Sequence, residues 1–281
     1  MTPIPTSADR ALTWAQQRVP GVPHALDALD RERVAGGTLL AGGLAYRLFF
    51  WLVPLGLVIA SLLGFWERGD PQSLETAGQE FGLSASAVQS STEAIEQEAH
   101  NRWYYLVVGL ILLFWFAIGV VRALRISFAV AWDVRPGPMR RPILAGAVFT
   151  LLGVSLILVS GATQLAREQL GTEGLLPTIA LILVYAVVAL WMMTLLPHAD
   201  ASLTALVPGA VLVALGMQAM HLVIALYLAP KLGRSSELYG SLGAATVILL
   251  GLYFTARLIT ASAFLNAALW ERKRRTEATE P

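Results

Sequence analysis

The sequence predicts an all-α fold: a polytopic membrane protein with six transmembrane helices, an N-terminal interfacial helix and a short helical external loop. Of its 281 residues, 56% are hydrophobic and only 14% are charged, and the mean hydropathy is +0.63. Six long apolar runs occur, and five carry no formal charge over 18 or more residues. A helix needs about 20 apolar residues to cross a hydrocarbon core of about 30 Å, whereas helices of a soluble domain keep a polar face. Six spans and their connections use nearly the whole chain, so no soluble catalytic domain is expected.

The first element is a cytoplasmic segment, residues 1–38. Within it, His24–Val34 carries Leu26, Leu29 and Val34 between alternating charges, a pattern that favours a helix lying along the inner leaflet. A solvated linker is the alternative. No short apolar region precedes a small-residue cleavage site, so we expect the first span to act as its own insertion signal.

A membrane domain is predicted for residues 39–270. Its first span, Leu39–Phe65, contains Pro54, which removes one backbone hydrogen bond and predicts a kink that could serve gating. The external loop, residues 66–102, holds seven acidic residues and is expected to form two short surface helices, either solvated or docking a partner. The remaining spans, followed by a charged cytoplasmic tail at 271–281, are Tyr104–Val121, Ile143–Leu165, Leu175–Pro197, Ala201–Pro230 and Leu238–Ala256.

Basic residues orient the chain. Thirteen Lys and Arg lie in the two terminal segments and the second connection, five lie in the opposite connections, and two fall within helices. Basic residues accumulate on the cytoplasmic side. Both termini are therefore predicted to be cytoplasmic, in a multi-pass protein of the bacterial inner membrane.

The candidate substrate-binding residues are polar side chains at membrane depth. Arg47 and Arg257 are the two arginines within the helices, and a central arginine costs about 2.5–3.5 kcal/mol on insertion scales. Asp133 and Asp200 are the only acids identified near them, so a net positive field suited to a phosphate or carboxylate is expected. Alternatively, Arg47 extends to the inner interface, and Arg257 pairs with backbone carbonyls, Asn266 or Tyr253. The proposed set is Arg47, Arg257, Gln218, His221 and Tyr253, with Pro54 for gating.

Catalysis is not expected. The chain has no cysteine, and its four histidines (His24, His100, His198 and His221) are scattered. Metal-dependent cleavage needs clustered ligands, so no catalytic residue, metal or cofactor is predicted. The absence of an aromatic and basic RNA platform argues against a nucleic-acid partner. Membrane lipids and an anionic substrate are the expected partners, and the oligomeric state is left open.

Three stretches resemble the YihY/BrkB (ribonuclease-BN-like) family of six-span bacterial inner-membrane proteins. They are Gly42–Pro54, then Leu195-Leu-Pro197 leading to Pro208-Gly-Ala210, and Tyr239-Gly-Ser-Leu-Gly-Ala244 continuing to Leu265-Asn-Ala267. There are departures from the usual family pattern: Trp51 stands in place of Ser, Phe264 in place of Glu, Arg257 at an apolar position, and His198-Ala-Asp200 in place of a more basic turn. The resemblance implies a plasma-membrane protein associated with envelope integrity and suspected of export, but it supplies no substrate.

Two functions remain in view. The first is an exporter or flippase-like transporter for an anionic solute or lipid that uses the arginines in a central cavity. The second is a non-transporting membrane scaffold or envelope assembly factor that docks partners through its charged loops. Nuclease activity is not expected, because no catalytic constellation is present.

Overall fold

The computed structural model describes residues 22–66, 102–170, 175–223 and 229–278. These residues form seven helices and no strand. The predicted surface helices of the external loop fall at 67–101, outside the described residues. The helices are α2 (Val22–Val34), α3 (Gly37–Trp66), α6 (Arg102–Ala131), α7 (Pro142–Leu170), α8 (Leu175–Leu195), α9 (Leu203–Val223) and α10 (Ala229–Glu277).

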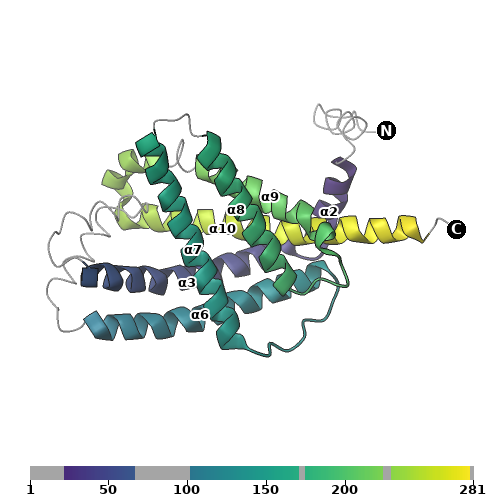
Figure 1. Cartoon of the computed structure of the whole chain (residues 1–281), viewed down its shortest axis with the longest axis horizontal. Helices are drawn as coiled ribbons and strands as arrows, with labels where there is room; N and C mark the ends of the chain where they lie inside the picture. Colours follow the sequence, from purple (N-terminus) through teal and green to yellow (C-terminus); the bar gives the residue numbers. More distant parts are fainter. Residues whose placement is uncertain (1–21, 67–101, 171–174, 224–228, 279–281) are drawn as a thin grey trace, which may run out of the picture.

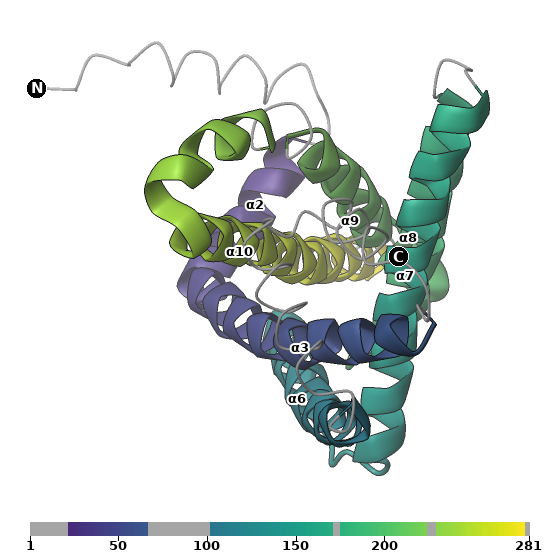
Figure 2. The same cartoon turned by 90° about the vertical axis from the view of Figure 1, so that its left-hand side faces the viewer.

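The longest helices pack side by side. Helix α3 lies against both α6 and α10, while α9 packs between α10 and α8. Helix α7 packs on α6 and α8, and the α7–α8 pair crosses α3, α6 and α10 steeply (Figure 1). Figure 2 shows this pair on one side of the other helices. The N-terminal helix α2 packs on the C-terminal half of α10.

Small residues let the helices approach closely. The buried core includes Ala41 and Ala45 of α3, Ala117 of α6, and Ala256 and Ala263 of α10, as expected where association in lipid depends on close packing. Larger side chains such as Leu124 and Phe128 fill the remaining space. Large apolar residues also lie exposed on the outer surface, among them Ile111, Trp115, Leu151 and Val187. The described residues therefore combine a packed interior with an apolar exterior suited to lipid.

Trp51, one of the departures from the family pattern, joins α3 to α7. Its indole Nε1 donates a hydrogen bond to Thr150 Oγ1 at 3.3 Å, and its ring lies 5.1 Å from that of Phe149. The ring also occupies the space beside Gly153, where an added Cβ would come within 2.6 Å of it. A packing role thus explains this tryptophan.

Within the described part of the chain, five helices are long and apolar enough to cross a membrane, namely α3, α6, α8, α9 and α10. Helix α7 has 29 residues, but its described apolar stretch, Pro142–Leu156, is shorter than a span. The six-span count therefore remains a prediction. Helix α3 continues through Pro54, and the predicted gating kink is untested.

Helix α10 carries the last apolar run. Leu238–Ala256 is the uncharged part of that run, and Arg257 was expected to lie within the same helix. Helix α10 is indeed one helix of 49 residues that passes through Arg257, and its membrane-length apolar part begins at Ile248 and continues past Arg257.

Candidate functional site

Arg257 forms an ion pair with Glu32 of α2, Nη1 to Oε1. The Glu32 side chain is only 2% exposed and that of Arg257 is 28% exposed. The prediction that only Asp133 and Asp200 could neutralise the arginines was therefore wrong for Arg257. Its counter-ion comes from the N-terminal segment, which precedes the first span. Burying an ionised carboxylate is costly unless it is paired and hydrogen-bonded, and Arg257 supplies that partner.

Asp133 and Asp200, the two acids predicted to lie near the arginines, have other positions. Asp133 is exposed and has a positive φ of 49° just after α6, and the next residue, Val134, donates its N–H to the Ala129 carbonyl at 2.9 Å. This is the pattern of a left-handed helix cap. Asp200 is exposed in the turn before α9.

Helix α2 presents a face to α10 that differs from the one its sequence suggested. Ala28 and Glu32, one turn apart, are buried, whereas Leu29 and Val34 are exposed. A second ion pair joins the same helices: Arg31 Nη1 lies 2.8 Å from Glu271 Oε2, and Arg275 approaches that carboxylate at 3.9 Å. The predicted helix is confirmed, and its interfacial position remains a prediction.

Two glycines form the corner that lets α2 reach α10. Gly36 has a φ of +71°, which glycine adopts without the steric cost of a Cβ, and its carbonyl accepts the N–H of Leu39 at 2.9 Å. Gly37 lies directly beneath Glu32, so that an added Cβ would sit 2.2 Å from Glu32 Cγ. The corner therefore determines where Glu32 can lie.

Gly37→Ala is expected to loosen α2 from α10. The new methyl group must displace Glu32, at a cost of about 1–3 kcal/mol for overpacking. Because the chain contains no cysteine, Ala28→Cys, at a site now 6% exposed, reports on docking through thiol labelling. Labelling should be about tenfold faster with Gly37→Ala. Gly43→Ala is the control, because nothing lies within 4 Å of the added Cβ; equal rates in both variants would contradict the proposed corner.

The structure does not bring the five predicted binding residues to one place. On α10, the residues that meet α9 include Thr255, Leu258 and Asn266. At 100° per residue, Arg257 and Tyr253 lie on the opposite side of α10. Gln218 and His221 belong to α9, so α10 separates them from Arg257. Gln218 is buried, and its Oε1 has no hydrogen-bond partner among the described residues. The binding role of the set stays a prediction.

Arg47 lies elsewhere again. It is exposed on α3, and its Nη1 is 3.0 Å from the position that a Cβ on Gly119 of α6 would occupy. Gly119 is one turn before Arg122 and twelve residues before α6 ends at Ala131. The extension of Arg47 to the inner interface therefore stays a prediction.

A polar site that the sequence did not reveal joins α9 to α10. Asn266, fully buried, accepts the backbone N–H of Gly209 at 2.7 Å and donates to the Leu206 carbonyl at 3.0 Å. Gly209 permits this approach, since a Cβ there would lie 2.4 Å from Asn266 Nδ2. The stretches Pro208-Gly-Ala210 and Leu265-Asn-Ala267 thus meet in space. In the sequence, only the family resemblance, which both stretches carry, linked them.

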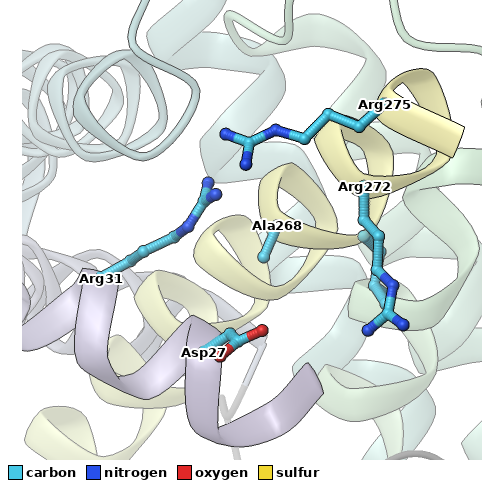
Figure 3. Close-up of a pocket in the computed structure, with 6 residues that line it drawn as sticks. Asp27, Arg31, Ala268, Arg272 and Arg275 are labelled. Carbon is cyan, nitrogen blue, oxygen red and sulfur yellow. The ribbon is translucent and has the colours of Figure 1, made fainter. Parts of the chain in front are cut away.

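Two cavities are lined by arginines of α2, α6 and α10. The first, of about 230 Å³, lies between α2 and α10 and is lined by Asp27, Arg31, Ala268, Leu269, Arg272 and Arg275. Arg31 and Arg275 point towards the same space from the two helices (Figure 3), and their shared contact with Glu271 offsets their charge. The second, of about 420 Å³, is lined by Arg122, Arg125, Ile126, Pro136, Gly137, Met139 and Pro142.

Aromatic contacts hold this end together. The Trp132 ring, just after α6, lies 5.7 Å from that of Trp270 on α10, and Arg274 lies over the Trp270 ring at 4.9 Å. The ion pair of Arg31 with Glu271 attaches α2 at the same place. The second connection, the N-terminal helix and the end of α10 therefore share one end of the protein.

No group of three or more His, Asp or Glu side chains positioned to hold a metal occurs within the described ranges 22–66, 102–170, 175–223 and 229–278. The family model described as virulence factor BrkB matches residues 28–281. No significant match is found among curated proteins or solved structures.

Proposed function

The chain belongs to the virulence factor BrkB family of proteins, and on that premise we propose that this multi-pass membrane protein transports an anionic solute or lipid by exchanging the partner of Arg257. In the resting state the guanidinium is neutralised by Glu32. A phosphate or carboxylate group of the substrate would replace Glu32, because arginine forms paired hydrogen bonds with either anion. This exchange keeps the intramembrane charge compensated throughout.

The Glu32–Arg257 pair is the observation that carries the proposal. Ionisable groups inside a membrane protein are costly and often functional, and this one joins a helix at a glycine corner to the middle of α10. Tyr253 lies one turn from Arg257 on the same face. Displacement of Glu32 would release α2, which gives substrate binding a route to a conformational change.

The proposed location is the bacterial inner membrane, with both termini cytoplasmic. Two facts support this orientation: the excess of basic residues in the terminal segments and second connection, and the meeting of those segments at one end of the protein. No enzymatic step and no nucleic-acid partner form part of the proposal.

A second candidate is a membrane scaffold. The complete neutralisation of Arg257 by Glu32 favours it, because such a pair can simply lock α2 against α10. The locked helix would then help to form a fixed basic surface for a partner.

Transport in proteoliposomes distinguishes the two. The double variant Glu32→Gln with Arg257→Gln removes both charges and so leaves no buried ion unpaired. We expect it to slow the flipping of a fluorescent phosphatidylglycerol by about tenfold, the value of one lost charged hydrogen bond. The control removes an exposed ion pair of the same helix, Lys273→Gln with Glu277→Gln, and should flip the lipid at the wild-type rate. Wild-type flipping by the first variant would refute the exchange at Arg257, and no flipping by the wild-type protein above protein-free liposomes would refute transport and favour the scaffold.

A further inference from the structure

The cavity at the end of α6 has arginines on one wall and apolar side chains on the others. Arg122 and Arg125 supply its charge, and among the residues that the structure describes no acidic one lines it. Ile126, Met139 and two prolines complete the wall. The cavity between α2 and α10 differs, because it contains Asp27 and its Arg31 pairs with Glu271. Of the two cavities, the α6 cavity is therefore the one whose arginines have no acidic residue beside them in the described lining.

Local geometry holds this cavity open. Ile118 of α6 contacts α7 beside Gly146, where an added Cβ would lie 3.1 Å from Ile118 Cγ1. Arg122 and Arg125 follow one and two turns later on the same side of α6, where the chain leaves α6 and later enters α7. Arg125 Nη2 donates to the Gly137 carbonyl at 2.7 Å, which fixes the connecting loop over the cavity. Arg122 remains as the arginine that can turn fully to a ligand.

The surroundings point to a lipid rather than a soluble anion. Exposed apolar side chains continue from the cavity along both helices, away from the end of α6: Ile111 and Trp115 on α6, and Leu144 and Leu151 on α7. The Arg47 guanidinium lies against Gly119, one turn before Arg122, and adds positive charge nearby. A phosphate at Arg122 would therefore have acyl chains beside an apolar surface, the arrangement found where basic pockets between helices bind anionic headgroups.

We propose that the cavity lined by Arg122, Arg125, Ile126 and Met139 binds the phosphate headgroup of an anionic phospholipid, with the acyl chains lying along α6 and α7. The guanidinium of Arg122 forms charge-assisted hydrogen bonds to the phosphate, while Arg125 shapes the cavity. This site is separate from the Glu32–Arg257 pair and requires no transport.

Native mass spectrometry of the full chain in detergent tests the proposal by counting bound lipids during titration. Dioleoylphosphatidylglycerol should bind about tenfold more tightly than dioleoylphosphatidylcholine, and Arg122→Gln should remove that preference. Arg122→Lys, which keeps the charge but loses the planar fork, should retain part of it. Arg140→Gln is the matched control, because Arg140 is exposed on the same connection but does not line the cavity.

Three results would overturn the lipid site. Unchanged preference in Arg122→Gln would place the lipid elsewhere, and an equal loss in Arg140→Gln would indicate only diffuse surface charge. Displacement of the lipid by inorganic phosphate at the same concentration would show that the cavity takes a soluble anion. Because binding is measured at equilibrium, its failure leaves the flipping result for Arg257 unaffected, and the reverse is also true.

Discussion

Glu32→Gln is expected to lower the free energy of unfolding by about 3 kcal/mol, because it leaves Arg257 without a counter-ion inside the helical bundle. Loss of one partner from a buried pair costs about 3–5 kcal/mol. We expect a cost at the lower end of this range, because the Arg257 side chain is 28% exposed and water can partly solvate its charge. Unfolding by SDS in mixed micelles, followed by tryptophan fluorescence, measures the change.

Two comparisons make this result specific. Adding Arg257→Gln to Glu32→Gln should restore most of the lost stability, because the unpaired charge is then removed. Glu277→Gln breaks the exposed pair with Lys273 on the same helix and should cost less than about 1 kcal/mol. If the double variant were no more stable than Glu32→Gln, the pair would not be the source of the effect.

The sequence predicted the helices well because lipid imposes a simple rule: long uncharged runs become helices. It failed where a charge from one segment is neutralised by another. Arg257 was expected within a helix, and α10 does run through it, but Glu32 was not recognised as its counter-ion. Glu32 lies in a short charged stretch whose apolar residues suggested a different buried face. Periodicity shows that a helix has two faces, but the partner decides which face is buried.

The contacts between motifs could not be predicted either. Helices approach closely at Gly209 and Gly216, where an added Cβ would lie 2.4 Å from Asn266 Nδ2 and 2.6 Å from Leu258 Cδ2, respectively. The paired glycines Gly42 and Gly43 do not mark such a contact, because nothing lies within 4 Å of a Cβ at either position. Glycine in the sequence permits two helices to approach closely, but the path of the chain determines which glycines face another helix.

Gly209→Ala is expected to destabilise the protein by about 3 kcal/mol, the combined cost of overpacking and of weakened hydrogen bonds. The methyl group would lie 2.4 Å from Asn266 Nδ2 and 2.7 Å from the Ser262 carbonyl oxygen. One of these neighbours is a backbone atom, so α9 and α10 must separate. Separation in turn weakens the hydrogen bonds of Asn266 to Gly209 and Leu206.

The same SDS titration measures this change, and Gly251→Ala provides the control on α10. No atom lies within 4 Å of a Cβ at Gly251, so alanine there should be neutral or stabilise by up to about 1 kcal/mol through helix propensity. Asn266→Ala in the Gly209→Ala background removes the side-chain clash but leaves that with the Ser262 carbonyl. The combined loss should therefore be smaller than the sum of the single losses. Strict additivity would mean that Gly209 and Asn266 stabilise the bundle independently, contrary to the contact between them.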